Sequence, residues 1–307
     1  MSSVYLSVVR RLLALVLAAS LAFFLLRLLP GDAISAQLAT SRFSEAFIQE
    51  RRTELGLEDP ILTQYAGFLT RTFQGDFGTS LSTGQPVTDM IAQAFIPTLS
   101  LSLTAFVIAS LIGFMIGTLS GITPTTPFGR AARLFSSIAI STPIYWTGTL
   151  AILVFSVGLR WFPSGGTGTL SHLLLPALIL GFHASGAIAE TLRANLRSTY
   201  RMDFVRTGHA KGLPPQRILT RHVLRVVLIP VVTVMALQAG FLLSGTVITE
   251  LLFTRAGLGR LLLDSIMRRD YPVIQAIVLL SAFTITLLNF AADLLYLLLD
   301  PRLRDAA

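Results

Sequence analysis

Residues 203–230 read DFVRTGHAKGLPPQRILTRHVLRVVLIP and separate two long apolar runs. The segment carries five Arg or Lys side chains and one acidic residue, and Gly212 and the pair Pro214-Pro215 interrupt any helix through it. Short loops of a membrane protein that are rich in Arg and Lys stay on the cytoplasmic side of the bilayer, where a second protein can reach them. The stretch therefore predicts a helical membrane protein with a structured cytoplasmic loop that contacts a partner.

The composition also indicates a membrane protein. Hydrophobic residues make up 53% of the 307 residues, charged residues only 13%, and the mean hydropathy is +0.71. Soluble domains carry about 25% charged residues, so this deficit favours several membrane spans. The net charge of +8 does not indicate nucleic-acid binding, because the basic residues punctuate apolar runs instead of gathering on a soluble domain. The chain has no cysteine, which excludes disulfides and Cys-ligated metals.

Six apolar runs are long enough to cross about 30 Å of hydrocarbon. They are residues 12–29, 97–122, 134–157, 173–189, 226–250 and 273–299. Each is expected to be helical, because lipid offers no hydrogen-bond partner to an open backbone. Pro143, Pro176 and Pro230 are expected to kink or start helices. The first run is interpreted as a retained helix and not as a signal peptide, since no small-x-small cleavage site closes it. The expected fold class is all-α integral membrane with six transmembrane helices.

The distribution of positive charge predicts the orientation. With six spans, the short segments on the side of both termini carry fourteen Arg or Lys residues, and the two short segments opposite carry five. Positive charge stays inside, so both termini are expected to be cytoplasmic. The expected organisation is an N-terminal transmembrane helix (1–30), an external loop (31–96), a five-helix core (97–299) with the cytoplasmic loop 191–225, and a cytoplasmic tail (300–307).

The external loop, about 66 residues long, is interpreted as a docking surface or lid, with a tethered connector as the alternative; residues 45–57 could form an amphipathic helix within it. In the second span, small residues recur every four positions, at Gly113, Gly117 and Gly121. This spacing lets another helix approach closely. Packing within the chain is favoured over a subunit interface.

The cytoplasmic loop is expected to form two helices around a corner. Asp203 is a plausible N-cap of a short helix, Gly212 offers a left-handed stop, and Pro214-Pro215 starts the next helix. A stripe of cations, Arg217, Arg221 and Arg225, then follows at four-residue spacing. Contact with lipid headgroups explains these arginines but not the compact corner. A rigid corner suits a short helix that fits a groove on another protein and transmits movement.

The chain resembles the permease subunits of binding-protein-dependent ABC importers, in the branch that handles dipeptides, oligopeptides and nickel. That branch typically reads Thr-Ala-Arg-Ala-Lys-Gly-Leu in its cytoplasmic loop, where this chain has Thr207-Gly208-His209-Ala210-Lys211-Gly212-Leu213. Further matches, in chain order, are Leu29-Pro30-Gly31-Asp32, Gly56-Leu57-Glu58-Asp59-Pro60, Gly75-Asp76-Phe77-Gly78-Thr79-Ser80, Pro86-Val87, Pro97-Thr98-Leu99, Glu250, Gly257-Leu258-Gly259-Arg260, Arg269-Asp270-Tyr271-Pro272-Val273, Asn289, Asp293, Tyr296 and Asp300-Pro301-Arg302.

The resemblance implies the type I importer architecture in a bacterial inner membrane. Its partners would be a second homologous permease subunit, two ATP-binding cassette ATPases and an external solute-binding protein. No phosphate-binding Gly-x-x-x-x-Gly-Lys-Ser/Thr motif occurs in the chain, so ATP and Mg are expected on the ATPases and no cofactor on this chain. The residues that would couple to the ATPases are Asp203, Arg206, Thr207, Ala210, Lys211, Gly212 and Leu213. Gly208 and His209 depart from the usual Ala and Arg, and both departures would weaken the docking.

The expected function is import by alternating access, driven by the partner ATPases, with di- or oligopeptides as cargo. Nickel or a metal chelate is the alternative cargo. A secondary carrier driven by an ion gradient is the alternative of a different class, but it would call for inverted repeats and charges near the midplane, and no repeat is visible. An enzyme is disfavoured because the sequence shows no convergent nucleophile or metal set.

A few polar residues within the spans are candidates for a pore or gate. Asn289, Asp293 and Tyr296 lie on one face of the last helix, where Asp293 could line a pore or, as we favour, pair with an arginine near the cytoplasmic end. Glu250, at the outer end of the fifth span, could face cargo or simply meet water. His183, inside a span, is expected to be hydrogen-bonded between helices.

Overall fold

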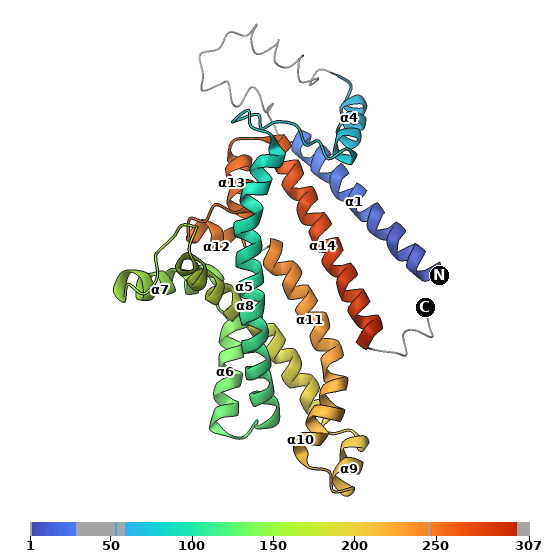
Figure 1. The fold of residues 1–307 in the computed structure, drawn as a ribbon, viewed down its shortest axis with the longest axis vertical. Coiled ribbons are helices and arrows are strands. Elements are labelled where there is room, and N and C mark those ends of the chain that lie inside the picture. The colour runs from blue at the N-terminus through green and yellow to red at the C-terminus, as the bar shows by residue number, and fades with distance from the viewer. Residues whose placement is uncertain (1, 29–52, 54–58, 245, 300–307) are drawn as a thin grey trace. The chain divides into compact units, whose positions relative to one another are not determined.

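The structure is a computed structural model that describes residues 2–28, 53, 59–244 and 246–299. In the described part of the chain, every regular element is a helix, and Thr79 and Pro86 form an isolated antiparallel bridge. The elements are α1 (Ser2–Leu28), α4 (Ile61–Phe73), α5 (Val87–Ile122), α6 (Pro127–Ser141), α7 (Ile144–Ala151), the π-helix η1 (Ile152–Gly158), α8 (Leu170–Thr199), α9 (Asp203–Ala210), α10 (Pro215–Ile218), the π-helix η2 (Leu219–Val223), α11 (Leu224–Ser244), α12 (Val247–Leu252), α13 (Leu258–Met267) and α14 (Tyr271–Leu299) (Figure 1). The predicted all-α class is confirmed. The expected helix at 45–57, the first two matched motifs as far as residue 58, and the tail 300–307 lie outside the described residues.

Five of the expected spans are single helices that are long and apolar enough to cross a membrane. They are Val9–Leu28, Val87–Ile122, Leu170–Thr199, Pro215–Leu243 and Tyr271–Ala291. The third expected span, 134–157, is instead a bent pair, α6 followed by α7 and η1, with an angle of 108° between its parts. Among the described residues the candidate spans therefore number five, or six if the bent pair counts as one.

The bend in the third span occurs at Pro143, where a break was predicted. Thr142, directly before it, leaves the helical region with φ −88° and ψ 139°, because a proline ring clashes with a helical backbone in the preceding residue. Pro143 is itself extended, with ψ 136°, and α7 starts after it. What the sequence did not indicate is how far the chain turns there.

The fifth expected span, 226–250, also differs from the prediction. Its helix begins earlier, at Pro215, and α11 ends at Ser244. The short helix α12 then carries Glu250. Glu250 therefore does not belong to the spanning helix itself.

The chain divides into two compact units. Unit 1 comprises residues 1–97 and 256–286, and unit 2 comprises 98–255 and 287–307. In unit 1, Phe23 of α1 packs against Tyr65 and Phe68 of α4. At the start of α14, the Asp270 carboxylate accepts four hydrogen bonds from residues 80–82: two from serine hydroxyls and two from backbone N–H groups, over 2.5–3.2 Å. This buried carboxylate fixes the turn between Thr79 and Pro86.

The core of unit 2 is built on the contact between α5 and α8. A Cβ added to any of the three glycines of the stripe would lie within 3 Å of a residue on α8. The neighbours are Ile188 for Gly113, Ala189 and Leu192 for Gly117, and Leu196 for Gly121. The glycine stripe is thus occupied by a helix of the same chain, and the expectation of intrachain packing is confirmed. Because glycine presents no side chain, the backbones of the two helices approach closely along their length.

The opposite side of α5 is apolar and open. Leu103, Val107, Leu111, Met115 and Leu119, spaced every four residues, are exposed by 41–68%. A row of large apolar side chains of this length is unfavourable in water and is what a lipid-facing helix presents.

Candidate functional site

The coupling segment, residues 203–213, begins with the short helix α9. Asp203 was predicted as its N-cap, but the residue with the extended N-cap backbone is Met202, with φ −75° and ψ 149°, and Asp203 is the first helical residue. In the first turn an acidic side chain still interacts favourably with the helix dipole. Its carboxylate lies 3.9 Å from the Arg206 guanidinium, and both side chains are more than four-fifths exposed. A surface pair of this kind adds little to stability.

The end of α9 is a tight, fully hydrogen-bonded turn. Gly212 has φ +72°, so the predicted left-handed stop is confirmed. The N–H of Leu213 donates to the Gly208 carbonyl at 3.1 Å, and the N–H of Gly212 donates to the His209 carbonyl at 2.9 Å. These two bonds define a Schellman motif, which satisfies carbonyls that the helix end would leave open. No atom lies within 4 Å of a Cβ built on Gly212, so the demand for glycine there is conformational alone.

The coupling segment rests on a small apolar base. Val205 and Gly208 are the buried residues of α9, and a Cβ on Gly208 would lie 3.3 Å from Ile218 Cδ1 of α10. Leu213 packs against the same core cluster as Val205 and Ile218. The remaining predicted coupling residues are exposed: Asp203, Arg206, Thr207, Ala210, Lys211 and Gly212. The corner is therefore anchored on one side and open on the other.

The second half of the corner starts as predicted but contains an unpredicted π-helix. Pro214 is extended, and Pro215 opens α10. The buried residues that follow, Ile218, Val223, Val227 and Val231, are spaced by five and then by four residues. The wider turn of η2 absorbs the additional residue, and so keeps one apolar face toward the core. Such a local register shift cannot be recognised from the sequence period alone.

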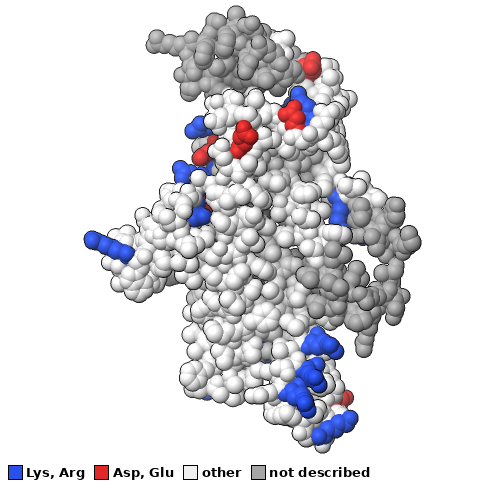
Figure 2. Space-filling model, viewed as in Figure 1, with Lys and Arg blue, Asp and Glu red and all other residues white. Residues whose placement is uncertain are grey.

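Positive charge gathers at this end of unit 2 (Figure 2). Arg217, Arg221 and Arg225 are all exposed. The sequence contains no acidic residue from Phe204 to Thr249, so the segment has little negative charge of its own to neutralise these side chains. At the base of the corner, burial raises the pKa of the Tyr200 phenol, which favours its neutral form.

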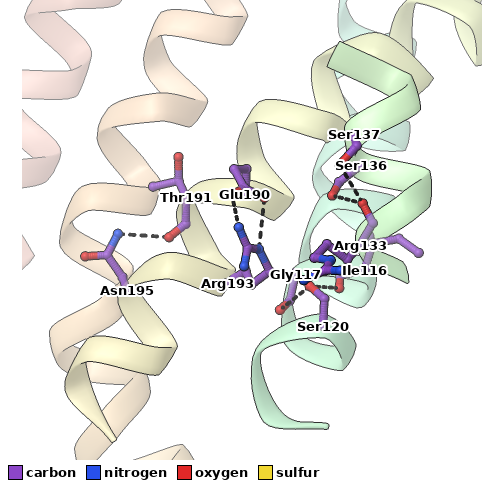
Figure 3. Close-up of polar contacts among 10 residues, drawn as sticks. All are labelled: Ile116, Gly117, Ser120, Arg133, Ser136, Ser137, Glu190, Thr191, Arg193 and Asn195. Carbon is purple, nitrogen blue, oxygen red and sulfur yellow. Dashed lines mark hydrogen bonds and ion pairs between the residues drawn. The ribbon is translucent and has the colours of Figure 1, made fainter. Parts of the chain in front are cut away.

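Above the corner, polar side chains of α5, α6 and α8 bond within their own helices (Figure 3). Glu190 and Arg193 form an ion pair within one turn of α8, with Arg193 Nε donating to Glu190 Oε2 at 2.9 Å. Asn195 donates to the Thr191 carbonyl, and the Ser120 hydroxyl donates to the Ile116 carbonyl. Each hydrogen bond drawn in Figure 3 connects residues of the same helix. These side chains therefore do not link the helices to one another, and packing holds the helices together here. The three-residue spacing of Glu190 and Arg193 could have indicated their pairing from sequence.

His183 connects parts of the bent pair to α8. Its Nδ1 donates to the Ala139 carbonyl of α6 at 2.8 Å, and its Nε2 accepts from the Thr147 hydroxyl of α7 at 2.7 Å. The expected hydrogen bonding between helices is confirmed.

Glu250 is fully buried, so neither sequence alternative, cargo contact or contact with water, describes this conformation. The Thr98 hydroxyl of α5 donates to Glu250 Oε1 at 2.6 Å. Arg255 interacts electrostatically with Glu250, and its Nη1 donates to the His172 carbonyl at 2.9 Å. Burial lowers the pKa of the Arg255 guanidinium, and the nearby Glu250 carboxylate opposes that change. The sequence did not indicate that Thr98 and Arg255 interact with Glu250.

The last helix carries the other pore or gate candidates. Asn289 is exposed on α14. Asp293 and Tyr296 lie on the same helix, but their side chains are outside the described part. The roles of Asn289, Asp293 and Glu250 stay predictions.

Two family descriptions cover nearly the whole chain. "Binding-protein-dependent transport system inner membrane component" matches residues 109–305, and the N-terminal description of the same transport system matches residues 4–102. The chain belongs to this family. The permease is thus an ABC importer subunit of the peptide type and a multi-pass protein of the bacterial inner membrane.

Named relatives match over almost their full length. The "Glutathione transport system permease protein GsiC" of Pectobacterium atrosepticum is 40% identical over 301 residues, covering 96% of the permease and 98% of the relative. The proteins of the same name from Salmonella choleraesuis and Escherichia coli K12 are 39% and 38% identical over 302 residues. Each match covers 97% of the permease and 98% of the relative.

Solved structures show the same fold at low sequence identity. The MetNI methionine ABC transporter, in an inward-facing conformation, matches with a TM-score of 0.58 and 17% identity, over 69% of the permease and 97% of that chain. An amino acid ABC transporter solved with histidines matches with a TM-score of 0.53 and 16% identity, over 68% and 94%. Membership in the importer family sets aside the ion-gradient carrier as the class of transporter.

Proposed function

We propose that the permease and a second homologous subunit line the membrane pathway of an ATP-driven importer, and that partner ATPases move it through the coupling segment. The observation that carries this proposal is the corner at 203–213. A Schellman turn fixes its end, Val205 and Gly208 anchor it, and its other side chains remain exposed for a partner. A segment that is rigid and open in this way can be gripped from outside and can pass the movement on to α8 and α11.

The proposed mechanism is alternating access. Two ATPases hold ATP and Mg, and their closure displaces α9. The turn at residues 211–214 connects α9 to α10, which continues directly into η2 and α11. Because α11 and α8 share one apolar core with α5, the displacement reaches the spans. An external solute-binding protein delivers the cargo and chooses it. The transport energy comes entirely from the partners.

The proposed cargo is a small peptide of the glutathione kind. Support comes from the relatives named for glutathione transport, which match along the whole chain at 38–40% identity. Glutathione is itself a short peptide, so this cargo agrees with the di- or oligopeptide expectation. No observation favours nickel or a metal chelate, the alternative cargo. Within residues 2–28, 53, 59–244 and 246–299, no group of three His, Asp or Glu side chains is placed so that it could bind a metal ion.

Uptake into proteoliposomes that contain both permeases, both ATPases and the solute-binding protein tests the cargo. We expect ATP-dependent uptake of labelled glutathione or small peptides, and none of a nickel chelate. Exchanging the solute-binding protein for one of different specificity should change the cargo accordingly. An unchanged cargo profile after the exchange would place selectivity in this pore and contradict the proposal.

A further inference from the structure

A buried polar network lies in unit 2 at α12, far from the coupling segment (Figure 1). Glu250, Thr98 and Arg255 are exposed by 0%, 1% and 3%. Through the bonds of Thr98 to Glu250 and of Arg255 to the His172 carbonyl, the network joins α5, α12 and the start of α8. The network therefore connects residues that lie 152 and 83 positions apart in the sequence.

The turn that leads to Arg255 is strained. Thr254 has φ +46°, a left-handed conformation that is costly for a β-branched residue. It stands where a Schellman turn normally has glycine: the N–H of Arg255 donates to the Glu250 carbonyl at 2.8 Å, and that of Thr254 to the Leu251 carbonyl at 3.2 Å. Gly165 faces this turn so closely that a Cβ there would lie 2.7 Å from the Phe253 carbonyl oxygen. The strain is the cost of returning Arg255 to the side of Glu250.

A buried hydroxyl beside Glu250 is unsatisfied. Thr249 is 1% exposed, and its Oγ1 has no hydrogen-bond partner among the described residues. An unpaired buried polar group is unfavourable, because it has lost its hydrogen bonds to water and gained none in the protein. One short helix thus combines a buried carboxylate, an unpaired hydroxyl and a strained end. Strained features of this kind cluster at ligand clamps and switch regions, where the strain is part of the mechanism.

We propose that Thr98, Glu250 and Arg255 form a latch that is closed in this conformation and opens during the transport cycle. Thr98 is a positioning residue that holds the Glu250 carboxylate against α5. Opening separates α12 from α5 and admits water to Thr249. The inference rests on the proposed function, because the cycle that opens the latch is the one driven by the partner ATPases.

The chain offers a direct reporter of this opening. It has no cysteine, and replacing Thr249 by cysteine removes a hydroxyl that makes no hydrogen bond. The importer, assembled from Thr249→Cys permease, partner permease and ATPases in nanodiscs, is treated with a water-soluble maleimide, and the label on this chain is followed by mass spectrometry. We expect labelling at least tenfold faster in the state trapped with ATP and vanadate than without nucleotide. Equal rates in the two states, in particles that hydrolyse ATP before trapping, would overturn the proposal.

Two variants at position 98 separate a latch from a purely structural contact. Thr98→Val keeps the shape and removes the hydroxyl, whereas Thr98→Ser keeps the hydroxyl. In the Thr249→Cys background without nucleotide, we expect at least tenfold faster labelling of Thr98→Val and an unchanged rate for Thr98→Ser. If Thr98→Val fails to assemble, Glu250→Gln, which removes the charge facing Arg255, should give the same acceleration. Resting rates equal to those of the Thr249→Cys parent in an assembled variant would contradict the latch.

The same particles distinguish failure of the latch from failure of the proposed function. ATP hydrolysis stimulated by the solute-binding protein tests the function, and its absence would refute the function alone. The comparison of Thr98→Val with Thr98→Ser at rest needs no nucleotide and still decides the latch.

Discussion

Replacing Gly212 by valine tests the coupling corner with a change whose cost can be worked from the structure. Gly212 has φ +72°, and no atom lies within 4 Å of a Cβ built there, so the variant creates strain and no clash. A left-handed residue with a side chain costs about 1–2 kcal/mol, and a β-branched one falls at the upper end. If the turn rearranges to relieve that strain, it loses two backbone hydrogen bonds worth about 0.5–1.5 kcal/mol each.

A cost of about 2 kcal/mol shifts the equilibrium of the native corner by roughly thirtyfold, since each 1.4 kcal/mol is tenfold. We expect Gly212→Val to retain ATP hydrolysis in the assembled importer but to lose most uptake, because the corner no longer passes on the movement. The assay is the number of ATP molecules hydrolysed per solute taken up into proteoliposomes, which should rise severalfold.

The matched control is Gly212→Asn, because asparagine tolerates the left-handed region. It should couple nearly as well as the original chain. Uptake by Gly212→Val at the original rate would refute the role of the corner.

Three further variants test the packing around the site. Gly208→Ala should stabilise α9 by about 1 kcal/mol, because alanine favours a helix more than glycine does and its Cβ meets side-chain atoms, Ile218 Cδ1 at 3.3 Å and Cγ1 at 3.4 Å, that can shift slightly. Hydrogen exchange across 203–211 should slow, and faster exchange would show that the contact is too tight. Gly117→Ala should lower the free energy of unfolding by about 1–3 kcal/mol, because its Cβ would lie 2.8 Å from the Ala189 carbonyl oxygen. The control Gly240→Ala should not lower it, because no atom lies within 4 Å of a Cβ at that position. Equal melting temperatures of the two variants would argue against close backbone packing. Asp270→Asn should lower the free energy of unfolding by about 1–3 kcal/mol, because the amide N–H₂ group, itself a donor, would replace an oxygen that accepts hydrogen bonds from residues 80–82. An unchanged unfolding temperature would contradict the role of Asp270 in the turn.

The parts of the fold that depend on local sequence, within a run or a few residues, were predictable. Apolar runs of sufficient length must be helical in lipid, and all but the third became single spanning helices. Gly212 and the prolines after it act locally, through allowed backbone angles, so the corner at 203–213 could be read from the sequence.

The parts that depend on distant partners were not predictable. Glu250 is buried because Thr98 reaches it from 152 residues away, and no spacing in the sequence connects the two. The π-helix η2 lets both Ile218 and Val223 pack into the same core, although they are five residues apart. This register shift depends on tertiary packing, so the period of the sequence does not predict it. The direction of the chain after Pro143 depends likewise on the contacts of α7 with its neighbours.

The central claim is that the permease is a passive pathway moved by separate ATPases. Proteoliposomes that contain both permease subunits, prepared with and without the ATPases, measure this directly through solute uptake in the presence of the solute-binding protein. We predict uptake only when the ATPases and ATP are present, and no ATP hydrolysis by the permease alone. Uptake driven by an ion gradient in vesicles without the ATPases would contradict the account.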